Sequence, residues 1–306
     1  MKKIVLAGGT GNLGTMLIRL FREQNYEIVV LSRQKMVKHH PKVDYVLWDA
    51  ENLGDWQEKL NGADVLINLC GLSINRRFTE KNKKLLRSSR ITPTKLLGKA
   101  ISNLKDPVKL WINFSGVSLF NGAKQIKDET SKQYSNDFLG QLAQDWEKAF
   151  LDAEVPKTEK VILRMSPILS KSSGMFAELY PLVKLGLGGK VGNGEQMISW
   201  IHEDDFVRLI DWIVNSQINE PIYHACSPNP VSNAEFMEEF RKSAGALFGM
   251  PLPTFMAKIG SFVKNVDSSL LLETVPVTTI LTLKNGFQFN FPYIQPALNQ
   301  LIKSST

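Results

Sequence analysis

The chain has 306 residues, of which 43% are hydrophobic, so it is long and apolar enough for one large or two modest domains with a sizeable core. No apolar run approaches the roughly 20 residues that span a membrane, and Cys70 and Cys226 form neither a CxxC pair nor a metal-binding spacing. The net charge of +7 favours anionic small molecules as partners. We therefore expect a cytoplasmic protein with no metal site, no membrane partner and no nucleic-acid partner. The sequence does not indicate an oligomeric state.

Short apolar runs alternate with amphipathic segments, which predicts a parallel sheet flanked by helices. The expected strands are residues 4–7, 27–31, 44–47, 64–69, 108–114 and 160–164, and the expected helices are 13–24, 56–60, 79–102, 138–153 and 206–214. Pro93 predicts a kink or break in the longest helix. Asp204 or Asp205 is the expected N-cap of the helix at 206. From about residue 231 we expect two or three helices with proline breaks at positions 251, 253 and 276, and a final helix after residues 286–289.

Glycines at positions 8, 11 and 14 lie between the first expected strand and the first expected helix. One glycine permits a tight turn, one lets a pyrophosphate approach the backbone, and one lets the helix pack closely on the strand. The helix N-terminus then offers free N–H groups to phosphates. The alternative is an ordinary turn of an α/β protein. The order of strand, turn and helix favours a dinucleotide-binding loop made of Gly8, Thr10, Gly11, Asn12, Leu13 and Gly14.

Ser32 and Arg33 follow the second expected strand, where NAD-specific sites place a carboxylate for the ribose 2′-OH. An arginine engages a 2′-phosphate through charge-assisted hydrogen bonds, and Ser32 adds a donor. We therefore expect NADP as the cofactor, with NAD as the alternative. Arg33 is otherwise a surface arginine in a loop. Asp49 is expected either to accept a hydrogen bond from the adenine amino group or to form a turn.

Sequence blocks along nearly the whole chain resemble an atypical branch of the extended short-chain dehydrogenases/reductases, the epimerase-family proteins that are similar to NAD(P)-binding nucleotide-sugar epimerases. The blocks are residues 8–14, 71–79, 89–94, 137–139, 145–147, 185–189, 199–202, 228–236 and 286–289. The resemblance implies a Rossmann-type doubly wound α/β sheet. It places the NADP-binding domain in residues 1–165, completed by about 199–225. A smaller substrate-side C-terminal region would comprise residues 166–198 and 226–306.

The resemblance also implies which positions face the cofactor. Besides the glycine loop and Ser32-Arg33, these are Leu69, Cys70, Arg90 and Ile168. In an open α/β sheet ligands lie outside the carboxyl ends of the strands, which agrees with most of these positions. Gly71 would let a ribose or phosphate approach the backbone. Arg90 is expected to reach the pyrophosphate or to pair with an acid.

Catalytic residues are harder to assign, because active short-chain reductases pair a serine after the fifth strand with a downstream Tyr-x-x-x-Lys. Ser115 occupies the serine position and is a candidate for both catalysis and cofactor contact. The one formal Tyr-x-x-x-Lys, Tyr180 to Lys184, follows the sixth strand and is interrupted by Pro181. The resembled branch generally lacks this pair. His202 is expected either to act as a general acid or base or to hydrogen-bond structurally before a helix.

Arg76 and Arg77 are expected either to clamp a substrate phosphate or to be exposed charges at a helix entry. These features lead to the hypothesis of an NADP-binding oxidoreductase or epimerase-like protein, acting on an anionic or nucleotide-linked small molecule without Tyr-x-x-x-Lys. The alternative is a non-catalytic NADP(H)-binding regulator or redox sensor, since some relatives are linked to cell division. A third hypothesis, nucleic-acid binding through the basic residues 76–90, lacks a recognition motif.

Overall fold

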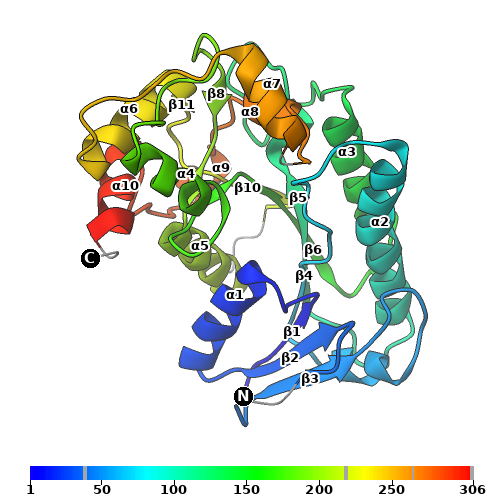
Figure 1. The fold of residues 1–306 in the computed structure, drawn as a ribbon. Coiled ribbons are helices and arrows are strands. Elements are labelled where there is room, and N and C mark those ends of the chain that lie inside the picture. The colour runs from blue at the N-terminus through cyan, green and yellow to red at the C-terminus, as the bar shows by residue number, and fades with distance from the viewer. Residues whose placement is uncertain (37–39, 217–219, 264, 304–306) are drawn as a thin grey trace.

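The computed structural model describes residues 1–36, 40–216, 220–263 and 265–303. Its centre is a parallel sheet of seven strands in the order β3-β2-β1-β4-β5-β6-β10, which confirms the expected doubly wound α/β fold (Figure 1). The inner strands are buried along most of their length, because helices cover both faces. The strands are β1 (Lys3–Ala7), β2 (Glu27–Ser32), β3 (Val43–Leu47), β4 (Val65–Asn68), β5 (Leu110–Gly116), β6 (Glu159–Met165) and β10 (Ile222–Ala225).

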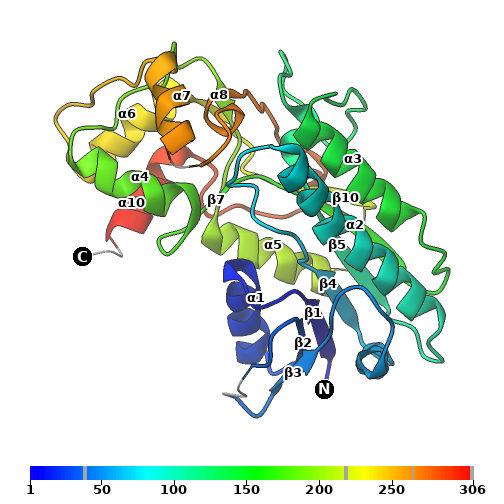
Figure 2. The same cartoon turned by 45° about the vertical axis from the view of Figure 1, so that its right-hand side comes forward.

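Helices lie on both sides of the sheet, as Figures 1 and 2 show. On one side are α1 (Asn12–Glu23) and α5 (Glu203–Asn215), and on the other α2 (Glu80–Ser102) and α3 (Phe138–Leu151). The 3-10 helices η1 (Asp55–Leu60) and η2 (Val117–Phe120) lie in connections. In α1, Leu17 and Phe21 recur at helical spacing and are buried in one core cluster with Ile4 and Ile28 of the sheet.

The remaining elements gather beyond the carboxyl edge of the sheet (Figures 1 and 2). Several of them share a separate core cluster that contains Trp200, Phe236, Phe240 and Leu298. Phe287 instead packs in the core of the main sheet, where it contacts Trp212 at a ring distance of 5.8 Å. These helices are α4 (Gly174–Lys184), α6 (Asn233–Ala244), α7 (Thr254–Val263), α8 (Ser269–Leu272), α9 (Leu281–Lys284) and α10 (Ile294–Lys303). Short strand pairs join β7 (Ile168–Leu169) to β9 (Ile201–His202) and β8 (Met197–Ile198) to β11 (Val231–Ser232).

The break expected at Pro93 and the N-cap expected for α5 were wrong. Helix α2 continues through Pro93, and both of its halves pack against α3: Leu86 shares a core cluster with Leu139 and Leu142, whereas Leu97 shares another with Phe150. The N-cap of α5 is neither Asp204 nor Asp205. It is His202, whose Nδ1 accepts a 3.1 Å hydrogen bond from the Asp204 backbone N–H. Strand β9 ends at this histidine, so the helix begins one residue later and both aspartates fall within its first turn.

The final helix expected after residues 286–289 is confirmed as α10, but the expectation of two or three helices before it was wrong. The described residues between 231 and 289 form four helical segments, α6 to α9. Two of them, α8 and α9, have four residues each. A single turn is too short to show a hydrophobic period of its own, so only its tertiary neighbours specify it.

Candidate functional site

Strands β1 and β4 are hydrogen-bonded neighbours, and the order in which the chain adds strands to the sheet reverses between them. The chain continues from β1 through α1 to β2 on one side, whereas β4 is followed by β5 on the other. In doubly wound sheets, ligands bind outside the carboxyl ends of the strands at such a point. Here the two carboxyl ends meet at Gly8 and Cys70, where a Cβ atom added to Gly8 would lie 3.0 Å from the Cys70 sulfur.

The glycine loop has the geometry that a phosphate-binding turn requires. Gly8 has φ of +75°, and its N–H donates to the Leu31 carbonyl oxygen at 2.9 Å. A side chain on Gly14 would overlap the Gly9 carbonyl, whereas a Cβ on Gly11 would meet nothing within 4 Å. Helix α1 has no side-chain cap and no acidic residue in its first turn, so its positive dipole end is uncompensated. Thr10 and Asn12 are exposed there and Leu13 is half-buried.

Ser32 and Arg33 lie at the carboxyl end of β2 in different environments. Ser32 is buried, and its Oγ donates to the Gln34 carbonyl oxygen at 2.9 Å and accepts from the Gln34 N–H at 3.1 Å. Its hydroxyl therefore shapes the turn. Arg33 is exposed and forms no ion pair with the residues that the structure describes. An arginine without a carboxylate partner is available to an anionic ligand.

Asp49 lies in the loop after β3 and forms a turn. One carboxylate oxygen accepts from the backbone N–H groups of Glu51 and Asn52 at 2.8 Å each, and the other accepts from the Asn52 side chain at 2.8 Å. The hydrogen bonds from Asn52, followed by that from Glu51, lower the pKa of Asp49 to about 2. A contact with adenine stays a prediction.

Around the end of β4, Leu69 continues the sheet by donating its N–H to the Ala7 carbonyl oxygen at 2.9 Å. Cys70 is buried, and burial raises the pKa of its thiol to about 12, although the charge of Arg33 acts in the opposite direction. This thiol is therefore not a reactive group at neutral pH. On the other side of the switch point, Ile168 begins β7 and packs against the core of the main sheet.

Arg90 faces Gly71, where an added Cβ would lie 3.1 Å from the guanidinium carbon. The guanidinium donates to the Leu72 carbonyl oxygen at 3.0 Å and lies 5.2 Å from the centre of the Trp146 ring. Within the described residues it has carbonyl and hydroxyl partners and no acidic one. Burial, together with the nearby charge of Arg76, lowers the pKa of Arg90 to about 10. Of the two sequence alternatives, the acid pair is therefore not formed.

Ser115 belongs to a buried polar cluster that the sequence did not predict. Its Oγ donates to Glu147 Oε1 at 2.7 Å. Arg164 donates from Nε to the same oxygen at 2.8 Å and from Nη2 to Oε2 at 2.9 Å. Burial acts to lower the pKa of Arg164, but the hydrogen bonds and charge of Glu147 raise it overall. The available signal was an arginine directly after the apolar run of β6 and a glutamate next to Trp146 on a buried helix face.

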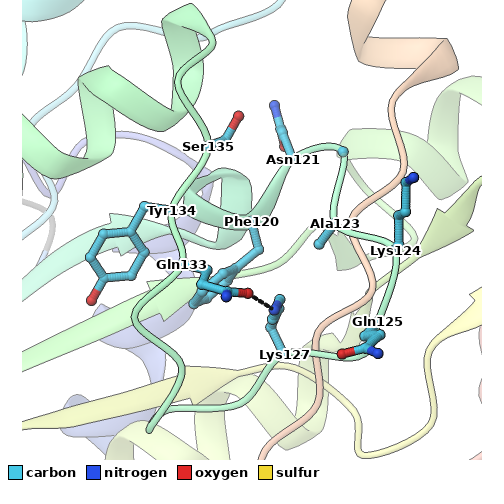
Figure 3. A pocket seen from close by; sticks show the side chains of 10 residues that line it. Phe120, Asn121, Ala123, Lys124, Gln125, Lys127, Gln133, Tyr134 and Ser135 are labelled. Atoms are coloured by element: carbon cyan, nitrogen blue, oxygen red, sulfur yellow. Dashed lines mark hydrogen bonds between the residues drawn. The ribbon is translucent and has the colours of Figure 1, made fainter.

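Arg164 also contacts two residues that line a hollow after η2. Arg164 Nη2 donates to the Tyr134 hydroxyl at 3.3 Å, and the guanidinium lies 5.6 Å from the Phe120 ring centre. Phe120 and Tyr134 line a hollow of about 440 Å³ together with Lys124, Lys127 and six other residues, none of them acidic. Figure 3 shows Lys127 hydrogen-bonded to Gln133, a contact of 2.9 Å. Neither lysine forms an ion pair with the residues described here.

The remaining catalytic candidates are engaged in packing. His202 is fully buried, caps α5 with Nδ1, and places Nε2 3.0 Å from Gln300 Oε1. Burial lowers its pKa. These contacts favour the structural alternative for His202. Tyr180 stacks on Phe176 at 5.5 Å in the C-terminal core, and Lys184 lies over the Tyr180 ring, so this pair is not arranged as a Tyr-x-x-x-Lys site beside β5.

Arg76 and Arg77 both lie in the loop between β4 and α2 and are half-buried. Arg76 Nε donates to the Ser73 carbonyl oxygen at 2.8 Å. The Arg77 guanidinium lies 4.4 Å from the Phe262 ring centre, so it joins this loop to α7. In the basic stretch that follows, Lys83 pairs with Glu80 and Arg87 with Asp145, as expected of a solvated helix face.

The described ranges contain no group of three or more histidine, cysteine or acidic side chains that could hold a metal ion. No helix within them has the length and apolar character needed to cross a bilayer.

The strand order, the glycine turn at the switch point and the helix that follows define an NAD(P)-binding Rossmann protein of the extended short-chain dehydrogenase/reductase type. The chain belongs to the NAD dependent epimerase/dehydratase family, whose model matches residues 4–226. Similar proteins match over nearly the full chain. Epimerase family protein ML0860 of Mycobacterium leprae is 30% identical over 97% of this chain and 94% of its own length. Human epimerase family protein SDR39U1 is 28% identical over 98% and 99%.

Solved structures show the same fold. The human SDR39U1 structure, which was determined with NADPH, has a TM-score of 0.85 at 27% identity and covers 98% of this chain and 99% of that chain. A nucleoside-diphosphate sugar epimerase from Corynebacterium glutamicum has a TM-score of 0.76 at 26% identity, over 97% of this chain and 57% of that chain. MoeE5 in complex with UDP-glucuronic acid and NAD is 14% identical with a TM-score of 0.77, which supports the fold alone.

Proposed function

We propose that the protein binds NADP(H) at the β1–β4 switch point and acts as an oxidoreductase or epimerase-like protein on an anionic or nucleotide-linked small molecule. The observation that carries this proposal is the glycine turn, with positive φ at Gly8 and open space at Gly11, placed before an uncapped helix N-terminus and near the exposed Arg33. The similar human protein was solved with NADPH, which supports the same cofactor.

Each part of the cofactor has a proposed partner. The backbone N–H groups at the start of α1 take the pyrophosphate, and Arg33 takes the 2′-phosphate that distinguishes NADP from NAD. Gly71 and Arg90 would contact the cofactor on the β4 side. The Arg90 guanidinium has no acidic partner among the described residues, so its charge is available to an anionic cofactor. Leu69 and Ile168 would pack against it. When bound, the cofactor supplies the site that accepts or donates a hydride.

Ser115 has a proposed role as a hydrogen-bond acceptor. Because its hydrogen points to Glu147, its oxygen lone pairs remain for a donor such as a substrate hydroxyl. A proton received there could pass on to Glu147 as the serine hydrogen moves to the carboxylate. Arg164, which binds both oxygens of Glu147, fixes the orientation of that carboxylate.

The anionic character of the substrate is supported by the hollow after η2. Lys124 and Lys127 line it and no acidic residue does, so its field favours a phosphate or carboxylate. The similar proteins are epimerase-family proteins and include a nucleoside-diphosphate sugar epimerase. They favour an oxidoreductase or epimerase over the alternative of a non-catalytic regulator.

The test has two stages. Fluorescence titration of the full chain with NADPH and with NADH measures cofactor binding, and we expect tighter binding of NADPH. The protein loaded with cofactor is then incubated with a panel of nucleotide sugars, and hydride transfer and product epimers are followed by absorbance and NMR. Failure to bind either dinucleotide would overturn the proposal. NADPH binding without turnover on any anionic substrate would revive the regulator alternative.

A further inference from the structure

The C-terminal part of the molecule exposes an unusual number of large apolar side chains. Nine of them come from two chain segments and are named here the apolar ridge: Leu185, Leu187, Leu247, Phe248, Met250, Phe255, Met256, Ile259 and Phe262. Leu247 is fully exposed, and Phe248 is 70% exposed. Soluble monomers rarely expose contiguous apolar patches of this kind unless the patch contacts a partner or a membrane.

The two segments that form the apolar ridge run side by side. The Met250 N–H donates to the Gly186 carbonyl oxygen at 2.8 Å, and the Gly189 N–H donates to the Met250 carbonyl oxygen at 3.1 Å. A Cβ on Gly186 would lie 2.7 Å from a ring atom of Phe248, so the Phe248 ring rests on Gly186. The leucines on either side of this glycine therefore lie next to the aromatic ring.

Helix α7 follows Met250 along the chain and adds exposed apolar residues of its own. Its exposed apolar residues are Phe255, Met256, Ile259 and Phe262, which recur at helical spacing, whereas Ala257 is buried on the other side. Both Phe255 and Ile259 expose more than half of their surface, at 63% and 59%. Figures 1 and 2 show α7 at the outer end of the molecule, opposite the end where β2 and β3 lie.

The charged residues within the two segments of the apolar ridge all have one sign. In the sequence, residues 179–194 and 245–266 contain no aspartate or glutamate and four lysines. Lys184 and Lys190 flank the leucine segment, and Lys258 lies within α7; all three are exposed. Lysines bordering an apolar helix face complement anionic headgroups.

We propose that the apolar ridge docks on the surface of an anionic lipid bilayer. The exposed leucine and phenylalanine side chains would enter the boundary between headgroups and acyl chains, while the lysines contact the headgroup phosphates. A second copy of the chain fits less well, because a symmetric contact would bring the same lysines of both copies together. The sequence predicted no membrane partner because no run is long enough to span a bilayer, but surface docking needs no such run.

Co-sedimentation of the full chain with vesicles tests this proposal. One set of vesicles contains phosphatidylcholine alone, and the other contains added phosphatidylserine. We expect binding to the second set, weakening as salt rises. Phe248→Ser and Ile259→Ser should each weaken it by about tenfold, and Lys258→Glu by about fivefold or more.

Matched control variants are Leu47→Ser, an exposed leucine on β3, and Lys157→Glu, an exposed lysine before β6. Both should bind vesicles like the unmodified chain, and NADPH titration together with circular dichroism reports whether each variant is folded. The proposal is overturned if the chain does not bind anionic vesicles at low salt, or if ridge and control variants bind equally. It is also overturned if the ridge variants instead convert a dimer to a monomer in size-exclusion chromatography without changing vesicle binding.

Discussion

The hydroxyl of Ser115 on β5 donates a 2.7 Å hydrogen bond to the carboxylate of Glu147 on α3. Both residues are buried, and Arg164 on β6 binds both oxygens of the same carboxylate. The contact ties two adjacent strands to a helix at the carboxyl edge of the sheet. It also leaves the oxygen lone pairs of Ser115, and not its hydrogen, for a ligand.

Glu147→Gln should destabilise the fold strongly. The amide removes the negative charge that compensates Arg164, which is fully buried. Breaking a buried ion pair in this way costs about 3–5 kcal/mol. Urea unfolding followed by circular dichroism measures the loss, and Glu154→Gln, at an exposed position, should change the free energy of unfolding by no more than about 0.5 kcal/mol. Equal midpoints for the two variants would show that the pair does not contribute to stability.

Ser115→Ala separates the structural role of the serine from its proposed chemical role. Loss of one hydrogen bond should lower the free energy of unfolding by about 1 kcal/mol. The affinity for NADPH should change little. Turnover on a substrate found in the panel should fall by about 100-fold, as expected for loss of a proton-transfer path. Unchanged turnover would remove Ser115 from the proposed chemistry while leaving the cofactor site intact.

Gly8→Val should abolish NADPH binding. The valine would have to adopt φ of +75° and would place its Cβ 3.0 Å from the Cys70 sulfur. Both effects disturb the turn that presents the N-terminus of α1. Isothermal titration calorimetry with NADPH measures the effect. Gly122→Val serves as the matched control, because Gly122 also has positive φ, of +73°, but an added Cβ would meet nothing within 4 Å.

Arg33→Ala should reduce the preference for NADPH over NADH. A charge-assisted hydrogen bond contributes about 1.5–3 kcal/mol, so the affinity for NADPH should fall by about 10- to 100-fold while that for NADH stays nearly constant. Competition between the two dinucleotides, followed by fluorescence, gives the ratio directly. A parallel loss of both affinities would place Arg33 near a phosphate that the two cofactors share.

Stability should decrease as the pH falls below about 6.5, the ordinary pKa of histidine. Burial lowers the pKa values of His202 and His224 in the folded chain, so the unfolded chain binds more protons in this range and is favoured. His202→Asn keeps an N-cap acceptor but cannot titrate, and it should therefore flatten the pH dependence of the urea midpoint between about pH 7 and pH 5. An unchanged slope would show that His202 is not one of the responsible groups.

Much of the nucleotide-binding half follows from local pattern. Alternating apolar strands and amphipathic helices, together with glycines at 8, 11 and 14, predicted the doubly wound sheet, because strand period, helix period and turn conformation are properties of neighbouring residues. The same local reasoning failed at His202, where the end of a strand decides the start of the helix, and at α8 and α9, which are too short for a period.

The sequence by itself determined the fold class and the location of the glycine loop, since both depend on contacts between residues close along the chain. Only the tertiary structure decided the partners of the polar side chains. Glu147 is 32 residues from Ser115 and 17 from Arg164, and Phe248 lies against Gly186 from a distant segment. Such pairings depend on which elements pack together. The free energy gained when these side chains are buried against each other cannot be read from the pattern of neighbouring residues.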